Sequence, residues 1–447
     1  MENIQKIREK YIELFNNNKS IFPGKNIQWL NEIRKEAMDQ FELHGFPDTS
    51  VEEWNVYSYK NLTNNFFPYD NKKNNKNVLS NIKKKDSNCF IRLIFSNGSM
   101  IKLEHEKLPK GVIVNSLKYF IEKYPEIIRG RIKPSNNYCE ERLSNILDVR
   151  SQSVVALNAA FHLDGVVIII EKGIEVPGYI EILNLDAHKE SYMSHVRSLI
   201  FLEEGAKCNV IEKTLHLNSS NNLLFSSEVV DINLSKNSSL SMARFIDGNL
   251  DNTNINSIHV EMDESSVFDS SSFIFSQGDA REEIRINING KDAISNINGL
   301  VLGSGSSKNE LLTKVRHIGK STKSNQIIRT ILSDKARGSF QGKIRVESKA
   351  DKTIANMSGK SLLLSELARV NSKPELEILA DDVNCSHGVT VGNLDLEQLF
   401  YLCSRGVSLD EAKKLLIRAF SEIIIGNLPS IFKREAEELV QTYYESR

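Results

Sequence analysis

The chain has 447 residues, of which 40% are hydrophobic, and its 57 basic and 58 acidic side chains give a formal net charge of -1. A nearly neutral chain without an extended basic cluster lacks the electrostatic footprint of nucleic-acid binding, so no nucleic acid partner is expected. The first residues, MENIQKIREKYIELF, mix charged with apolar residues, and no apolar run approaches a membrane span. We therefore expect a globular, cytoplasmic protein that does not bind membranes.

Cysteine usage argues against two common cross-links. The five cysteines stand at positions 89, 139, 208, 385 and 403, an odd number with no C-x-x-C pair. Their spacing predicts neither a disulfide framework nor a self-contained zinc site.

Residues 1–162 predict a mostly helical N-terminal domain. Apolar residues recur at helical spacing over residues 3–18 and 26–43. An Asn/Lys-rich stretch from about 62 to 88 has few apolar residues and is expected to be a mobile surface segment. Two strand-like runs follow, FIRLIF and GVIVNSL, before further helical patterning.

Residues 163–392 change to short apolar runs of period two, which predict extensive β structure. A weak repeat runs through them, because a polar turn with a small residue leads into strand after strand, at intervals near multiples of about 15 residues. The anchors of these turns are Ala206, Ser238, Ser265, Ala293, Ala336, Ala350, Ala368 and Val383. A two-sided coil buries a small residue at each corner, so the core is predicted to be a parallel β-solenoid, with an irregular β-sandwich as the alternative.

The last predicted rung carries DDVNCSHGVTVG, in which Cys385 and His387 alternate along one strand. Such residues share a face of the strand, with Cβ atoms about 7 Å apart. A free cysteine often behaves as a small buried hydrophobe, which favours packing. The corresponding slot in other repeats is assigned to Cys208, Leu240, Val267 and Val370. A histidine beside a thiol can also lower the thiol's pKa and hold a soft metal, although two ligands need a second chain to complete a site, so both interpretations stay open.

Residues 393–447 predict a C-terminal helical domain. Ser408 and Glu411 form a capping box, apolar residues recur at helical spacing behind them, and Gly426 follows as a helix stop. Three short helices cannot bury every apolar face among themselves. Part of this surface is therefore expected to meet a partner.

Two segments carry a resemblance to a known family. RVNSKPELEILADDVNCSHGVTVGNLDLEQLFYLCSRGVSLDEAKKLLIRAF and the preceding GSFQGKIRVESKADKTIANMSGKSLLLS resemble the SufB/SufD family of iron–sulfur cluster assembly scaffolds, and EEWNVYSYKNL near residue 52 is similar too. The resemblance implies a mainly β fold with flanking helices, in which a right-handed parallel β-helix lies between N-terminal and C-terminal helical domains. It also implies a scaffold subunit of the SufBCD complex of the SUF system, non-catalytic by itself, with SufB and the ATPase SufC as partners.

The two branches of the family differ at the cysteine–histidine pair. SufB typically carries an acidic E-H-E run where this chain has Ser386, His387 and Gly388, so the sequence is closer to the SufD type, with SufB as the alternative. The resemblance implies that Cys385 and His387 lie toward the SufB–SufD interface and serve cluster assembly, with metal ligation shared with a second chain as one version of that role. It further implies a cluster built transiently in the complex and no cofactor held tightly by this chain alone. A flavin in the complex and a homodimer of the isolated chain are left open.

The same resemblance places SufC on the C-terminal helices. The residues expected to meet it are Phe400, Tyr401, Arg405, Ser408 and Glu411. Because a solenoid rung depends mainly on its neighbours, deleting residues 394–447 is expected to abolish SufC binding while the β-helix still folds.

Enzymatic alternatives find little support in the sequence. The tripeptide GKS occurs twice, but Lys314 and Ile354 stand where a phosphate loop needs its leading glycine, and GSGSSK has Lys308 in place of the third glycine of a dinucleotide fingerprint. A β-helix polysaccharide-cleaving enzyme would need paired carboxylates, yet Asp381 and Asp382 are adjacent on a strand and face opposite sides. A thiol hydrolase lacks an orienting third residue.

Overall fold

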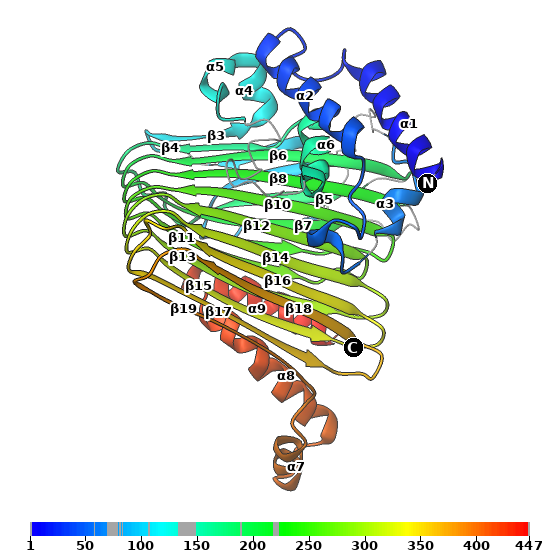
Figure 1. Ribbon diagram of the computed structural model, residues 1–447, viewed down its shortest axis with the longest axis vertical. Coiled ribbons are helices and arrows are strands. Elements are labelled where there is room, and N and C mark those ends of the chain that lie inside the picture. The colour runs from blue at the N-terminus through cyan, green and yellow to red at the C-terminus, as the bar shows by residue number, and fades with distance from the viewer. Residues whose placement is uncertain are drawn as a thin grey trace.

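Two parallel β-sheets, coiled into one solenoid, form the centre of the protein (Figure 1). The computed structural model describes residues 2–57, 59–68, 79, 82, 84–105, 108–132, 149–187, 190–217 and 223–445. About half of the Asn/Lys-rich stretch predicted to be mobile, including residues 69–78, lies outside these residues.

From residue 166 onward the strands alternate between the two sheets along the chain. In spatial order the ten-stranded sheet contains β19 (Val383–Gly392), β17 (Thr353–Leu363), β15 (Lys323–Leu332), β13 (Ile294–Gly303), β11 (Val267–Ile274), β9 (Ser239–Ile246), β7 (Lys207–His216), β5 (Tyr179–Asp186), β1 (Cys89–Ser96) and β2 (Ser99–His105). The nine-stranded sheet contains β18 (Arg369–Ile378), β16 (Arg337–Val346), β14 (Lys308–His317), β12 (Asp279–Ile288), β10 (Asn252–Met262), β8 (Leu224–Leu234), β6 (Tyr192–Leu202), β4 (Val166–Ile170) and β3 (Val112–Ser116).

This order confirms the predicted parallel β-solenoid and rules out the β-sandwich alternative. Each strand from β6 to β19 pairs in parallel with the strand two places earlier along the chain, so one turn of the coil contributes one strand to each sheet. The sheets also extend upstream of residue 163, since β1 pairs in parallel with β5, while β2 and β3 pair in antiparallel fashion with β1 and β4.

The space between the two sheets, the lumen, holds the main hydrophobic core. Alternate residues of each strand point into it and form a stack of Ile, Val, Leu, Met and Phe from β1 to β17. Small residues close the corners as predicted: Ala206, Ser238, Ala293, Ala336 and Ala368 are buried. The anchor at Ser265 is displaced by one, because Ser266 is the fully buried residue of that corner.

Residues with a left-handed backbone conformation lie at the corners that lead from the nine-stranded sheet to the ten-stranded sheet. Asn237, Ser265, Asp292, Ser321 and Lys352 all have φ between 56° and 62°. The backbone N–H of each donates to a carbonyl of the next rung, from Asn237 to Glu264 (2.9 Å) through to Lys352 and Asp382 (2.6 Å). This ladder links successive turns where the sheets themselves are interrupted.

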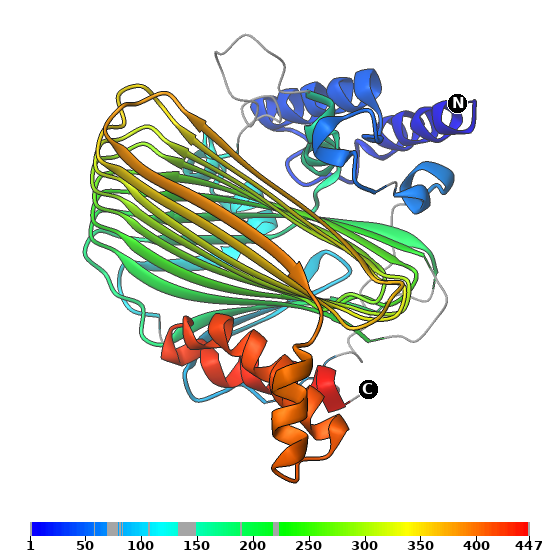
Figure 2. The same cartoon turned by 60° about the horizontal axis from the view of Figure 1, so that its bottom comes forward.

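Helices cover the outer face of each sheet (Figure 2). The N-terminal helices are α1 (Glu2–Asn18), α2 (Gln28–His44), η1 (Glu52–Trp54), α3 (Lys60–Asn64), α4 (Leu117–Lys123), α5 (Pro125–Ile128), η4 (Val149–Gln152) and α6 (Ser153–Phe161). An aromatic cluster including Phe41 and Phe161 packs them onto Phe225 of the nine-stranded sheet. The C-terminal helices are α7 (Leu396–Ser404), α8 (Leu409–Gly426) and α9 (Ser430–Glu445). No helix in the described ranges combines the length and the apolar character needed to cross a membrane.

A histidine in the N-terminal packing layer gives the first testable prediction. His195 is buried between Phe161 and Phe225, with ring centroids at 6.1 and 5.3 Å, and neither ring nitrogen has a hydrogen-bond partner in the described part of the chain. Burial lowers the pKa of His195 from 6.5 to about 3. The unfolded chain then binds the extra proton first, so stability falls as the pH drops below about 6.5.

We expect His195 alone to cost about 2 kcal/mol of unfolding free energy at about pH 5 relative to pH 7.5. In His195→Phe the loss of unfolding free energy between about pH 7.5 and about pH 5 should be smaller by that amount. Urea unfolding at both pH values measures it. An unchanged acid slope in His195→Phe would show that His195 is protonated in the folded chain.

Candidate functional site

At one end of the solenoid the last rung, formed by β18 and β19, is open. Each of these strands pairs with a single neighbour, β16 and β17 respectively, so its other edge presents unpaired backbone groups. Along β16 most residues are buried, whereas those of β18 and β19 are partly or fully exposed, including Ile378 and Val391. Pro374 lies in β18, where an edge strand tolerates the missing N–H. An open lumen of this kind is a surface that a partner can cover.

Cys385 and His387 lie on the lumen side of this last rung. In register they follow Ala355 and Met357 of β17, both buried in the lumen core. Cys385 is partly buried and packs against that core, and His387 is exposed. Through the paired strands, the Cys385 column runs back through Ala355, Ser324, Ser295, Phe268 and Leu240 to Cys208.

The predicted repeat alignment was therefore correct for Cys208 and Leu240 and wrong for two positions. Val267 precedes the column residue Phe268 by one, and Val370 belongs to β18 of the other sheet. The one-residue error arose at the same corner as the displaced Ser265 anchor. A shift of one residue in a strand moves a side chain from the lumen to the outer face.

The environment of Cys385 in the single chain does not activate the thiol. Burial raises the pKa of Cys385, and the opposing effect of a hydrogen bond from the Ala355 backbone is smaller. Among the described residues, no group of three or more His, Cys, Asp and Glu side chains is arranged to hold a metal ion. A metal site that Cys385 and His387 share with a second chain stays a prediction.

The predicted SufC-docking residues lie on and just after α7, which projects away from the solenoid (Figure 1). Four apolar side chains on α7 and at the start of α8 are exposed, and we call them the α7 patch: Leu396 (78% exposed), Phe400 (76%), Tyr401 (58%) and Leu409 (52%). Only Leu399 of α7 is buried. The guanidinium of Arg405 lies 5.3 Å from the centre of the Tyr401 ring.

Ser408 and Glu411 form the predicted capping box at the start of α8. The Ser408 hydroxyl accepts a hydrogen bond from the Glu411 backbone N–H (3.3 Å) and donates one to the Glu411 carboxylate (3.0 Å). Both side chains are thus engaged in capping the start of α8.

The rest of the C-terminal domain lies against the solenoid. Ile417, Ile424 and Phe432 of α8 and α9 pack on outward side chains of the ten-stranded sheet, namely Phe245, Phe273, Leu300, Leu302, Ile331 and Leu362. The expectation that the β-helix folds without residues 394–447 therefore needs revision, because their removal exposes this apolar face. Between α8 and the end of β19 lies a groove of about 410 Å³ that Phe420 and Leu394 help to line.

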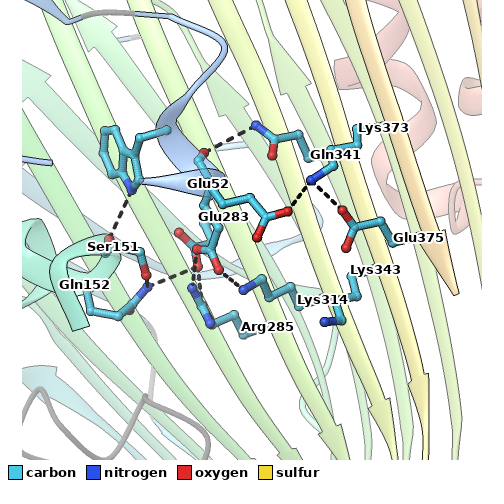
Figure 3. Close-up of polar contacts among 12 residues, drawn as sticks. Glu52, Ser151, Gln152, Glu283, Arg285, Lys314, Gln341, Lys343, Lys373 and Glu375 are labelled. Atoms are coloured by element: carbon cyan, nitrogen blue, oxygen red, sulfur yellow. Dashed lines mark hydrogen bonds and ion pairs between the residues drawn. The ribbon is translucent and has the colours of Figure 1, made fainter. Parts of the chain in front are cut away.

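A charged seam ties the N-terminal segment to the last rungs (Figure 3). Arg285, Lys314 and Lys343 stand in register on three adjacent strands, where like charges repel. Glu53 of η1 pairs with Arg285 (2.9 Å) and with Lys314, and Glu52 pairs with Lys373 of β18 (2.6 Å).

Gln341 completes the seam by donating a hydrogen bond to the Glu53 carbonyl (3.3 Å). A segment in the first eighth of the chain therefore contacts the edge strand at the open end. The sequence analysis missed this seam, although the resemblance did single out EEWNVYSYKNL, which contains both glutamates.

The two GKS tripeptides are structural. Gly319–Ser321 forms the corner between β14 and β15, and Gly359–Ser361 lies within β17. Ser304–Ser307 of GSGSSK likewise forms a turn between β13 and β14. None of these segments begins a helix, so none presents the helix N-terminus on which phosphate loops depend.

The fold and these surfaces define a two-sheet β-solenoid protein with an open last rung and an exposed apolar helix. Two family models match the chain in succession: "SufBD protein N-terminal region" over residues 5–182 and "SUF system FeS cluster assembly, SufBD core domain" over residues 185–420. The chain belongs to this SufBD family of the iron–sulfur cluster assembly system, as the sequence resemblance predicted.

Individual relatives agree with this assignment. The chain is 34% identical to the Escherichia coli iron–sulfur cluster assembly protein SufD over 235 residues, which are 53% of this chain and 55% of that protein. It is 23% identical to the Bacillus subtilis protein of the same name over 416 residues, 90% of each chain. A SufBD family protein of Synechocystis is 43% identical over 105 residues, 24% of this chain and 23% of that protein. The match thus spans about half of the E. coli relative and most of the B. subtilis one.

Proposed function

We propose that this chain is the SufD-type scaffold subunit of a cytoplasmic SufBCD complex, where it pairs with SufB and recruits the ATPase SufC. The observation that carries the proposal is the open last rung, with Cys385 and His387 on its unfinished lumen side. In this proposal β18 and β19 meet SufB, and the α7 patch meets SufC. SufB-type function for the chain itself is disfavoured by Ser386 and Gly388 beside the histidine, where SufB typically has acidic residues.

The proposed division of work leaves this chain without catalysis of its own. SufC supplies ATP hydrolysis, and the iron–sulfur cluster is the product assembled in the complex, with Cys385 and His387 contributing to a site that SufB completes. Burial raises the pKa of the Cys385 thiol in the single chain, so in this proposal the thiol becomes reactive only after SufB changes its surroundings. A flavin, if one takes part, belongs to the assembled complex.

The isolated chain should neither hydrolyse ATP nor bind it tightly. We expect it to stimulate ATP-dependent cluster formation when mixed with SufB and SufC under anaerobic conditions. Nucleotide binding is measured by calorimetry on the chain alone, and cluster formation by iron and sulfide content of the mixture. ATP binding by the chain at micromolar concentrations, or cluster formation independent of it, contradicts the proposal.

The open last rung also predicts that the isolated chain associates with a second copy of itself. Without SufB, two copies can cover their β18 and β19 edges by facing each other, so we expect the isolated chain to form a homodimer. Sedimentation before and after addition of SufB should show the homodimer giving way to the heterocomplex. A homodimer that persists beside excess SufB would mean that this chain does not use the open end for SufB.

A further inference from the structure

A short segment that follows α1 and α2 crosses the outer face of the nine-stranded sheet and reaches its edge strand β18 (Figure 3). We call residues 52–57 and 59 of this segment the strap. Its two glutamates contact one residue on each of the last four strands of the sheet, β12, β14, β16 and β18: Arg285, Lys314, Gln341 and Lys373. The strap thus links the edge strand to the three strands behind it.

Three buried aromatic side chains, those of Trp54, Tyr57 and Tyr59, fix the strap on these strands. The Arg281 guanidinium of β12 lies 4.2 Å from the centre of the Trp54 ring. The Tyr59 hydroxyl donates to the Glu310 carboxylate of β14 (2.6 Å), which also pairs with Arg281 (2.7 Å). The Tyr57 hydroxyl donates to a backbone carbonyl of β16. The strap is therefore a fixed part of the fold and holds its two glutamates in place.

Lys314 depends on the strap for its counter-ion. It stands in register between Arg285 and Lys343, its side chain is only 14% exposed, and it pairs with the Glu53 carboxylate. No other carboxylate of the described residues lies within ion-pair distance of its ammonium group. Arg285 and Lys343 each have a further carboxylate partner on the sheet itself. Without the charge of Glu53, a largely buried cation would stand between two others with no counter-ion, which is unfavourable.

The position of the edge strand depends on the strands that the strap holds. In the described part of the chain β18 forms a backbone ladder with β16 alone. Gln341 of β16, which donates to the strap, stands in register with Lys373 of β18. The direct contact from the strap to β18, between Glu52 and Lys373, is weak because the Glu52 side chain is 74% exposed. Glu53 therefore acts on the edge strand through β14 and β16.

We propose that Glu53 is a positioning residue for the open last rung: it compensates the charge of Lys314 and thereby holds β16 and β18 where a second chain can meet the β18 edge. The identification of that second chain as SufB rests on the proposed function, whereas the effect of Glu53 on β18 does not. Because such coupling is reciprocal, a chain bound at β18 should in turn slow backbone exchange in the strap. The N-terminal domain thus takes part in partner binding from outside the open end.

Hydrogen–deuterium exchange on the isolated full chain tests the position of β18 without any partner. Glu53→Gln keeps the shape of the side chain and removes its charge, and it should speed backbone N–H exchange in β16 and β18 about tenfold or more, with β6 and β8 unchanged. Lys314→Met removes the uncompensated cation, so the double variant Glu53→Gln with Lys314→Met should regain most of the protection. The matched control is Glu264→Gln, which removes an exposed carboxylate paired with Lys236 (2.9 Å) at a corner of the solenoid.

Calorimetry with SufB gives the functional readout. Glu53→Gln should weaken SufB binding about tenfold or more, and the double variant should recover it. Loss of a direct contact between Glu53 and SufB would not be repaired by Lys314→Met. Circular dichroism establishes that each variant is folded. If Glu53→Gln alone does not fold, the double variant is expected to fold and to bind SufB like the unmodified chain, and its failure to fold overturns the proposal.

Three further results overturn the proposal. The first is unchanged exchange of β18 in Glu53→Gln, and the second is a double variant that is no better protected than the single one. The third is faster exchange of β18 together with normal SufB binding, because the position of β18 would then not matter to the partner. If the unmodified chain does not bind SufB, the proposed function fails, whereas the exchange experiment still decides whether Glu53 positions β18.

Discussion

Cys385→Ser and His387→Ala should each leave the chain folded and able to join SufB and SufC, and should lower the iron and sulfide bound per complex about tenfold or more. The loss is expected to be larger for His387→Ala. His387 is exposed on the last rung, so its removal should change stability by less than about 0.5 kcal/mol. Iron and sulfide analysis of the purified complex, beside thermal melts, measures both effects.

Two control variants separate chemistry from packing. Cys208→Ser changes the same column in a complete rung, where the thiol is buried, and should cost about 1 to 3 kcal/mol of stability. Ser386→Ala alters the neighbouring residue on the opposite face of β19 and should leave cluster content unchanged. If Cys385→Ser behaves like Cys208→Ser, with a lower Tm and normal cluster content per folded complex, the cysteine is a packing residue.

Phe400→Asp should reduce SufC binding about thirtyfold or more, because it places a charge at the centre of the α7 patch, where an aromatic side chain is expected to anchor the interface. Tyr401→Ala should act in the same direction. Neither residue is buried in the single chain, so folding and SufB binding should persist. Co-purification of the three subunits and calorimetry with SufC provide the measurement.

The control for the α7 patch is another exposed leucine. Leu43 of α2 is 68% exposed on the N-terminal helices, and Leu43→Ala should leave SufC binding intact. Ser408→Ala removes the cap of α8 and should cost about 1 kcal/mol of helix stability, with a smaller effect on SufC than Phe400→Asp. Loss of SufB with retention of SufC in Phe400→Asp would show that the two interfaces have been exchanged.

Deletion of residues 394–447 does not test SufC binding alone, because it also exposes the apolar face of the solenoid that α8 and α9 cover. The helical periodicity identified α8 and its cap but could not tell which face of the helix would be covered. In the structure Ile417 and Ile424 meet the solenoid, while Leu415 and Ile423 remain about half exposed. The sequence of a helix predicts which of its residues form an apolar stripe. The surface that covers the stripe of α8 is formed by residues such as Phe273 and Leu300, which lie more than a hundred positions earlier in the chain.

The core of the fold was predictable because the solenoid repeats a local rule. A small residue at each corner and period-two strands are visible within any short window. The alignment failed near Ser265 and Val267, by one residue, and at Val370, which lies in the other sheet. The charged seam was not predictable in this way, and neither was the buried ion pair between Arg244 and Glu212 in the lumen (2.7 Å). Arg285 and Glu53, or Glu212 and Arg244, become neighbours only after the coil has set the register, and no spacing in the sequence signals the pairing.

The two ends of the solenoid differ in strand direction, and that difference decides how a second chain can extend each of them. At the first rung β2 and β3 run antiparallel to β1 and β4, so an added parallel coil finds no continuing template there. At the last rung the parallel pairing is unbroken, and the Lys352 N–H donates to the Asp382 carbonyl of that rung. Two chains that meet at their last rungs cover each other's β18 and β19 edges, so such an interface is closed and does not repeat along a fibre.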